Sequence, residues 1–541
     1  MSATEPLITT SPVTGRGRPA QTRPGNSPKR VTQALMRALQ TQPRSPATID
    51  GPRQRTWTEF GDRVARQAAI LQRMGLERGG RVAVLSLNSD CFLELLVSVA
   101  WAGGVVVPMN TRWVAAEIGA ALKDCAADIL LVDDAFVPVA TEIGKRVDGL
   151  RLGYLGHEAP PPGMIALELE IAGTAPVPDA CGSDDEIWAI VYTGGTTGHA
   201  KGVMLSHGNI VTAALVWNAT LHFTAATRYL HVVGFFHMAG LQQAIALIMA
   251  GGLHVVAAKF EPKQTLETIE TYGINFCLFV PTMLAMLMHH PDLTRHDLTS
   301  VKDCMYGGSA ISDAVLELGL QRLPGWRLVQ GYGQTEATGL ATTLDWDSHF
   351  GEGTANKRRC TGRVAHGVEL RIVDPAGHEV PRGTVGEVAV RGPTVMLGYW
   401  NQPDMTAEVI RGDWLHTGDA ASMDEDGFIK IVDRYKDMIV SGGENVFSRE
   451  VENAVSTHPA VRDCAVIGVP HPVWGEAVHA AVVLNDGATL SLDELAVHCR
   501  PSLAGFKHPR SMEVRASMPI SAAGKISKNI LRSEYRVDRA G

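Results

Sequence analysis

Short apolar runs alternate with longer amphipathic segments from about residue 80 onward. The runs are rich in β-branched residues and read as strands, whereas the segments between them place apolar residues on one helical face. The expected strands are 81–87, 129–132, 187–192, 254–257, 276–280 and 327–330, and the expected helices include 90–101, 266–272 and 312–320. Parallel strands joined by crossover helices give this alternation, so the pattern predicts a doubly wound α/β body.

The pattern changes past residue 360 to strand, turn, strand. The segment 368–392 contains turn signals at 374–377 and 381–383, which predicts a small β-rich subdomain that closes the large domain. A charged stretch at 433–437 then separates an apolar strand from a glycine pair, and we place the main linker there. A further α/β pattern follows, in the segments 449–456, 465–469, 477–484 and 492–500.

These boundaries predict four parts. Residues 31–432 form a large domain, 433–437 a hinge, and 438–541 a small C-terminal domain. Residues 1–30 are rich in Ser, Thr, Pro, Gly and Arg, with Glu5 as the only acid. We interpret them as a disordered tail, with an organelle transit peptide as the alternative.

Composition and charge narrow the class of protein. The chain has 541 residues, of which 45% are hydrophobic and 20% charged, as in soluble globular proteins. The formal net charge is -8 and no long Lys/Arg block occurs, so no nucleic-acid surface or polybasic membrane patch is expected. The uncharged run 241–258 is interrupted by Gly251, Gly252 and His254, and it predicts a buried helix and a strand rather than a transmembrane segment.

The eight cysteines are scattered, without a C-x-x-C pair or a histidine cluster at metal-ligand spacing. We expect reduced, mostly buried thiols in a cytoplasmic protein. The expected partners are small molecules, and a homodimer is the assembly to test.

The strongest local motif is the segment 192–202, YTGGTTGHAKG, which directly follows the apolar run IWAIV. Glycines let backbone N–H groups turn toward an anion, threonine hydroxyls add donors, and a lysine adds positive charge. The motif is not a Walker A loop, because no Gly-Lys-Ser/Thr occurs. We interpret it as a phosphate loop, with a structural turn as the alternative; its residues are Thr193, Gly194, Gly195, Thr196, Thr197, Gly198 and Lys201.

This segment resembles the phosphate loop of the adenylate-forming superfamily, which contains acyl-CoA synthetases, firefly luciferases and the adenylation domains of peptide synthetases. The resemblance extends in order over residues 35–532. It departs from the usual form at Gly194, where Ser is common, and at Ala200, where Pro is common. The resemblance implies a large adenylation domain of two doubly wound α/β subdomains plus a small β-barrel-like subdomain, with a small mobile α+β C-terminal lid domain.

The resemblance assigns roles to further motifs of the large domain. In FFHMAG, His237 is expected beside the bound carboxylate, and Glu336 of QGYGQTE is expected to hold Mg²⁺ with Thr196. Mg²⁺ prefers hard oxygen ligands such as carboxylates, which fits Glu336. Asp419 and Arg434 are similar to the pair that grips the ribose hydroxyls. The remaining expected contacts to ATP or AMP are Gly307, Gly308, Ser309, Gln330, Gly331, Tyr332, Gly333 and Thr335.

In the C-terminal part, the resemblance places the hinge at Lys436 and the adenylation lysine at Lys525. The family also has a loop that lines the tunnel for the thiol, and the segment similar to it here consists of Ser441, Gly442, Gly443 and Glu444. The implied catalytic residues are therefore Lys525, His237, Thr196, Glu336 and Lys201. The implied reaction uses ATP and Mg²⁺ to turn a carboxylic acid into an acyl-adenylate, releases pyrophosphate, and transfers the acyl group to coenzyme A.

The acid is expected to be apolar, a fatty acid first and an aryl acid second. The expected acyl pocket is uncharged and consists of Trp217, Phe235, Met238, Leu241, Cys304 and Thr338. A peptide-synthetase domain would need a carboxylate near position 237, which FFHMAG does not offer. A luciferase-like oxidase, a catalytically inactive regulatory homologue and an adenylating enzyme with an acceptor other than CoA remain as alternatives.

Overall fold

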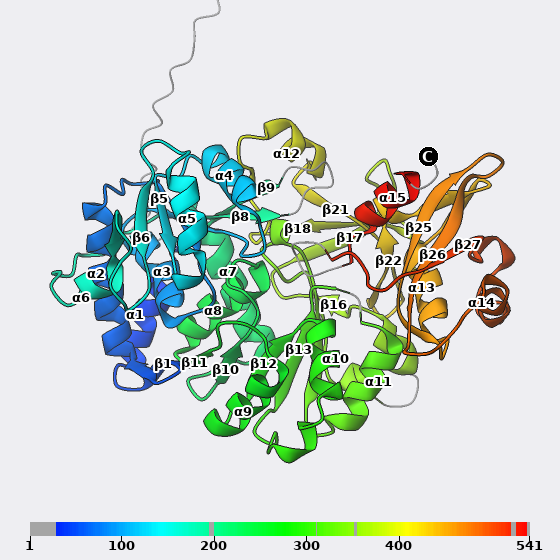
Figure 1. Ribbon diagram of the computed structural model, residues 1–541, viewed down its shortest axis with the longest axis horizontal. Coiled ribbons are helices and arrows are strands. Elements are labelled where there is room, and N and C mark those ends of the chain that lie inside the picture. The colour runs from blue at the N-terminus through cyan, green and yellow to red at the C-terminus, as the bar shows by residue number, and fades with distance from the viewer. Residues whose placement is uncertain (1–28, 194–199, 310, 351–353, 521–525, 538–541) are drawn as a thin grey trace, which may run out of the picture.

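The computed structural model describes residues 29–193, 200–309, 311–350, 354–520 and 526–537 (Figure 1). The centre of the expected phosphate loop, 194–199, lies outside the described residues, as do Lys525 and nearly all of the expected N-terminal tail.

An eight-stranded sheet forms the first subdomain. Its six neighbouring strands from β8 to β7 run parallel, as the sequence predicts, and two antiparallel strands extend one edge. In spatial order the strands are β19 (Gly398–Tyr399), β9 (Lys201–Ser206), β8 (Ile187–Thr193), β4 (Val105–Pro108), β3 (Arg81–Leu85), β5 (Ile129–Val132), β6 (Arg151–Tyr154) and β7 (Met164–Ala166).

A nine-stranded sheet forms the second subdomain. Its central strands are parallel, and the edge strands β16, β15 and β2 are antiparallel to their neighbours. In spatial order the strands are β16 (Arg363–Val364), β15 (Thr342–Leu344), β14 (Arg327–Tyr332), β13 (Asp303–Gly307), β12 (Phe276–Phe279), β10 (Arg228–His231), β11 (Leu253–Val256), β1 (Pro46–Asp50) and β2 (Arg53–Thr56).

Helices cover both faces of the two sheets (Figure 1). The main core lies between the sheets and joins strands of both through α3, α7 and α8, and every residue of α3 is buried. Separate cores lie on the outer faces. The helices of this part are α1 (Thr32–Thr41), α2 (Trp57–Arg73), α3 (Asp90–Trp101), α4 (Ala115–Asp124), α5 (Val137–Gly144), α6 (Leu167–Ile171), α7 (His207–Leu221), α8 (Met238–Ala250), α9 (Pro262–Tyr272), α10 (Pro281–His289) and α11 (Asp313–Arg322).

A curled antiparallel sheet follows, as the strand-turn-strand pattern predicts. The strand β22 pairs with β21, and α12 (Pro403–Val409) packs beside this sheet. The strands are β17 (Glu369–Val373), β18 (Gly386–Arg391), β21 (Trp414–Met423), β20 (Ile410–Arg411) and β22 (Ile429–Arg434).

The C-terminal part has its own five-stranded sheet and its own core, and it lies beside the rest of the molecule (Figure 1). The chain passes from the curled sheet to the C-terminal sheet between β22 and β23, in the segment where the hinge was expected. The elements are β23 (Ile439–Ser441), β24 (Glu444–Val446), α13 (Ser448–Ser456), β25 (Val461–His471), β26 (Gly475–Leu484), α14 (Leu492–Cys499), β27 (Ser511–Val514) and α15 (Lys528–Val537).

The observed architecture confirms the fold class. The apolar run 241–258 is the buried part of α8 followed by β11, as expected. Among the described residues, no helix is both long and apolar enough to cross a bilayer. All eight cysteines are described and carry free thiols, and six of them are buried.

Candidate active site

A cavity of about 240 Å³ lies beside the C-terminal ends of β8 and β14 and the curled sheet. Ligand sites of open α/β sheets form at this end of the strands. Four of the lining residues are cationic and three are glutamates, a mixture that suits a polyphosphate with a metal ion. The lining residues are Thr193, Lys201, Gln334, Glu336, Glu387, Tyr399, Glu408, Val409, Arg411, Leu415, His416, Thr417, Gly418, Arg434 and Lys436.

The Asp419 carboxylate anchors one side of the site. It is 5% exposed, accepts a hydrogen bond from the Tyr332 hydroxyl at 2.7 Å and pairs with Arg434 Nε at 3.0 Å. Asp419 and Arg434 are opposite each other in the β21–β22 pair, which explains how residues fifteen apart in sequence meet. Burial and the Asp419 charge raise the pKa of Tyr332 well above its usual value, so the hydroxyl remains a donor.

The Glu336 carboxylate faces the same cavity. Its Oε1 accepts a hydrogen bond from the Tyr399 hydroxyl at 2.9 Å, and its backbone oxygen accepts one from Met396 N at 2.9 Å. Lys201 Nζ lies over the Tyr399 ring, 5.0 Å from its centroid. Tyr399 therefore links the expected metal carboxylate to the expected phosphate lysine.

Glycines bring the two central strands of this region close together. A Cβ on Gly307 would lie 2.4 Å from the Gly331 carbonyl oxygen, and a Cβ on Gly333 only 1.4 Å from the Gly339 carbonyl oxygen. Gly308 has a φ of +77°, which favours glycine. A side chain at Gly307 or Gly333 would therefore overlap neighbouring backbone, so glycine is required at these ends of β13 and β14.

The segment with His237 follows β10 and leads into α8. Phe235 is fully buried and packs edge-on against Phe92, with ring centroids 5.6 Å apart. Met238 and Leu241 belong to the first turns of α8 and lie with Trp217 of α7 in the core between the sheets. The buried Thr338 hydroxyl donates a hydrogen bond to the Thr394 carbonyl oxygen.

Cys304 is not placed with the other expected pocket residues. Successive side chains of a strand point to opposite faces of the sheet, and Cys304 lies in the core on the outer face of the nine-stranded sheet. Its neighbour Met305 lies in the core between the sheets with Trp217 and Met238, and it approaches Gly331. Met305 therefore replaces Cys304 in the candidate pocket.

Two adjacent glutamines of α8 are unusual for buried residues. Gln242 and Gln243 are at most 1% exposed, and neither carboxamide has a hydrogen-bond partner among the described residues. Gln242 Oε1 lies against Gly339, where an added Cβ would approach it to 1.8 Å. A buried amide without a partner costs about 1–3 kcal/mol, so a bound water or ligand is expected to complete it.

The expected hinge residue Lys436 lines the cavity together with Lys201 and Glu336. Burial and the neighbouring Arg434 lower the pKa of Lys436. The turn 441–444 is on the C-terminal part, where Gly442 N donates to the Trp474 carbonyl oxygen at 2.9 Å. Trp474 is 37% exposed, and its ring is stacked on His471, with centroids 4.2 Å apart, and has Arg510 5.0 Å from its centroid. A group of one aromatic ring, one imidazole and one cation therefore lies beside this turn.

Comparison with known proteins identifies the family. A model described as "AMP-binding enzyme" matches residues 35–400, and one described as "AMP-binding enzyme C-terminal domain" matches residues 450–525. The chain belongs to the AMP-binding enzyme family. The resemblance to the adenylate-forming superfamily is thereby confirmed, and the chain is an enzyme of the AMP-forming acid–CoA ligase type.

Relatives and a solved structure match nearly the whole chain. A feruloyl-CoA synthase of Amycolatopsis sp is 37% identical over 506 residues, 92% of this chain and 98% of that protein. A long-chain-fatty-acid–CoA ligase of Bacillus subtilis is 33% identical over 498 residues, 86% of this chain and 88% of that protein. The ATP-bound structure of MatB from Rhodopseudomonas palustris has a TM-score of 0.86 at 29% identity, over 94% of this chain and 99% of that one.

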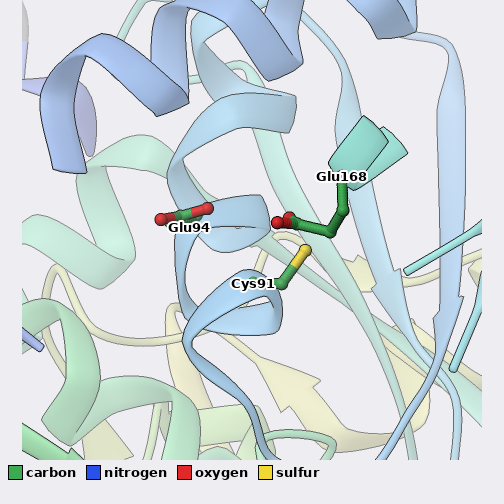
Figure 2. A group of neighbouring side chains, drawn as sticks. All are labelled: Cys91, Glu94 and Glu168. Atoms are coloured by element: carbon green, nitrogen blue, oxygen red, sulfur yellow. The ribbon is translucent and has the colours of Figure 1, made fainter. Parts of the chain in front are cut away.

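A second cluster of titratable groups lies away from this family's site. Cys91, Glu94 and Glu168 converge on α3 and α6 (Figure 2), close enough to hold a metal ion. Arg63 already pairs with both glutamates, at 2.7 Å to Glu94 and 2.6 Å to Glu168. Gln67 also donates to Glu94 at 2.7 Å. The guanidinium takes the place that a cation would occupy, so this cluster is part of the core.

The structure adds residues that the sequence patterns did not indicate. Tyr399 and Glu387 line the cavity but are not part of the motifs considered above. Glu387 accepts from His416 Nδ1 at 2.8 Å and from Gly418 N at 2.9 Å, so it fixes the turn before Asp419. The strand pairing of β18 with β21 brings these residues together, and no local sequence signal indicates it.

Proposed function

We propose that this protein is an ATP-dependent acid:CoA ligase for an apolar carboxylic acid. The acid carboxylate attacks the α-phosphorus of ATP, the bond to the bridging oxygen breaks, and pyrophosphate leaves with the electron pair. The CoA thiol then gives up its proton to solvent and its sulfur attacks the acyl carbon, the bond from that carbon to the phosphate oxygen breaks, and AMP leaves with the electron pair. The observation that carries the proposal is one cavity that unites Glu336, Lys201 and Arg434, the last of which pairs with Asp419.

Each group has a role that follows from its chemistry. Asp419 can accept hydrogen bonds from ribose hydroxyls, while Tyr332 and Arg434 hold its carboxylate in place. Lys201 and Lys436 would stabilise phosphate charge. The glycines at 307, 308, 331 and 333 would admit the adenine ring, with Ser309, Gln330 and Thr335 nearby as polar neighbours.

Glu336 fits Mg²⁺, which would neutralise charge on the triphosphate. Its carboxylate lines the cavity, and the hydrogen bond from Tyr399 goes to Oε1, so Oε2 can serve the ion. Thr196 is the second expected magnesium ligand. The remaining loop residues, Gly194, Gly195, Thr197 and Gly198, are expected to bind the phosphates. Thr193 and Lys201, which flank that loop, pair across β8 and β9 and both line the cavity.

The acceptor thiol is proposed to approach from the C-terminal part. Residues 433–437 would act as the hinge about Lys436, and a rotation there would replace Lys525 by the turn Ser441, Gly442, Gly443 and Glu444. The two glycines of this turn have φ values of +62° and +87°, and a Cβ on Gly443 would meet no atom within 4 Å. Gly442, Gly443 and Glu444 are exposed while Ser441 is buried, and the three exposed residues support the availability of the turn to a CoA chain.

Lys525 provides the sharpest test of this two-step reaction. A lysine that offsets repulsion between two approaching anions acts in adenylate formation only. We predict that Lys525→Ala slows acid-dependent pyrophosphate release by about 10²- to 10³-fold. The same variant should convert a synthetic acyl-adenylate and CoA to thioester at near the parent rate.

An equal loss in both steps would contradict the role given to Lys525. Lys507→Ala is a matched control, because Lys507 is also on the C-terminal part but is paired with Glu450 at 2.7 Å. This control is expected to leave both steps near the parent rate.

The acid class can be narrowed by the pocket. A fatty acid was the first expectation and an aryl acid the second. The buried carboxamide of Gln242, one helical turn beyond Met238, favours an acid whose apolar part bears a hydrogen-bonding substituent. The 37% identity to a feruloyl-CoA synthase supports the same choice, so a substituted aryl acid is now our first candidate and a fatty acid our second.

A panel of acids separates these candidates and the remaining alternatives. Acyl-CoA would be detected by mass spectrometry with ferulate, benzoate, octanoate, palmitate and free amino acids. We predict turnover of an apolar or aryl acid and rejection of amino acids, because a buried ammonium without a partner costs several kcal/mol. Absence of pyrophosphate release with every acid would favour an inactive homologue, and adenylate without thioester would favour another acceptor.

A further inference from the structure

The side chain of Asn88 ties the two large sheets together beside the candidate acid site. Asn88 follows β3 of the eight-stranded sheet and is 5% exposed. Its Nδ2 donates to the Val233 carbonyl oxygen at 3.0 Å, and its Oδ1 accepts from Phe235 N at 2.9 Å. Its backbone N–H donates to the Ala258 carbonyl oxygen at 3.3 Å. All three partners are in loops that follow β10 and β11 of the nine-stranded sheet.

The segment that Asn88 holds leads directly to His237. Gly234 lies between the two residues bonded to the carboxamide, and its carbonyl oxygen accepts from His237 N at 3.0 Å. A Cβ on Gly240 would lie 2.6 Å from the same oxygen, so the first turn of α8 is packed against this segment. Phe235 is fixed from the other side by Phe92 of α3. A shift of the Asn88 contact would therefore move His237.

We propose that Asn88 is a positioning residue that sets the location of the His237 segment for the acid substrate. The inference rests on the proposed function, because it needs His237 to face the acid. The carboxamide suits this role since one planar group satisfies a backbone C=O and a backbone N–H two residues apart. Among the described residues, none of the three hydrogen bonds of Asn88 goes to Asp419, to Glu336 or to a residue that lines the cavity, so its effect is directed at the acid and not at ATP.

The chain contains a matched control for this contact. Asn275 makes the same pair of bonds at the other end of β10, where Nδ2 donates to the Ala226 carbonyl oxygen at 2.9 Å and Oδ1 accepts from Arg228 N at 2.8 Å. Its two partners are also separated by one residue. Asn275→Ala therefore removes the same pair of hydrogen bonds in a less buried place, at the start of β10 and so at the end of that strand away from the His237 segment.

The test compares wild type, Asn88→Ala, Asn88→Ser and Asn275→Ala in pyrophosphate release. Ferulate and octanoate are the acid probes, each varied at saturating ATP, and ATP is then varied at saturating acid. We expect Asn88→Ala to lower kcat/KM for the acid by about tenfold or more, the effect of two lost hydrogen bonds. The KM for ATP should stay within about twofold, and Asn88→Ser should fall between Asn88→Ala and wild type. Asn275→Ala should leave the acid kcat/KM near wild type.

Other outcomes overturn the proposal. Equal changes in the acid and ATP parameters, or an acid defect in Asn275→Ala as large as in Asn88→Ala, would make Asn88 a structural residue only. Thermal unfolding checks that each variant folds, and Asn88→Ser supplies the result if Asn88→Ala is insoluble. A wild-type protein that releases no pyrophosphate with any acid would refute the proposed function itself and the inference with it, a result distinct from an active enzyme without the acid-specific defect.

Discussion

The hydrogen bond from Tyr399 to Glu336 gives a quantitative prediction. Tyr399→Phe removes one hydroxyl and keeps the ring that lies under Lys201. Hydrogen bonds to charged groups contribute about 1.5–3 kcal/mol, which corresponds to about 10- to 100-fold in rate. Because the bond holds the carboxylate proposed to bind Mg²⁺, we expect that loss in kcat/KM for MgATP, together with a higher magnesium requirement. Stability should change little, since water in the cavity can replace the hydroxyl.

The assay is pyrophosphate release at varied Mg²⁺ and ATP, with thermal unfolding in parallel. Tyr272→Phe is the matched control, because the Tyr272 hydroxyl lies remote from the cavity, 3.5 Å from the Gly51 carbonyl oxygen. In the double variant Glu336→Gln/Tyr399→Phe, the two effects should not add, because residues in contact are coupled. Additive losses, or a magnesium dependence identical to wild type in Tyr399→Phe, would show that the Tyr399 hydroxyl does not position the Glu336 carboxylate for Mg²⁺.

Two further predictions concern the thiol acceptor and pH. Trp474→Ala should raise the KM for CoA by about tenfold and leave pyrophosphate release unchanged. The reason is that the Trp474 ring, stacked on His471, packs beside Gly442 of the turn proposed to line the thiol path. Val497→Ala, an exposed apolar control on α14, should change neither quantity. Burial lowers the pKa of His207 to about 4, and its Nδ1 accepts from Val31 N at 3.2 Å. An unfolded histidine has a pKa near 6.5. The free energy of unfolding that the neutral His207 contributes is therefore fully present above pH 6.5. It is lost as the pH falls from 6.5 toward 4, by up to about 3 kcal/mol. Urea unfolding at pH 7.5 and 5 should therefore show a smaller pH effect in His207→Gln than in wild type, and equal effects would contradict this assignment.

The layered fold could be predicted because its signals are local. The strand 129–132 was predicted with its observed bounds, and so was helix 90–101, which Ser89 caps through Phe92 N. Bounds differed by up to four residues elsewhere, as at α9, which begins at Pro262 rather than 266. Proline is favoured in the first turn of a helix, so the start lies before the apolar positions that indicated it.

The site was harder to predict where it depends on pairing between distant segments. Asp419 and Arg434 could be predicted because they lie in recognisable motifs. Tyr399 could not, because it reaches the cavity only through the pairing of β19 with β9. The alternation of side chains along β13 decides that Met305 and not Cys304 faces the core between the sheets. Asn88 lies in no motif that indicated a role, because its role depends on a contact between the two sheets.

The most direct test of the central claim is a product analysis with purified protein, MgATP, CoA and ferulate. We predict equal amounts of feruloyl-CoA, AMP and pyrophosphate, a feruloyl-adenylate that accumulates when CoA is omitted, and no ADP. Octanoate in place of ferulate should give the same three products if the acid is a fatty acid. Formation of ADP and phosphate, or no AMP with any acid of the panel, would contradict the claim that this cavity forms an adenylate.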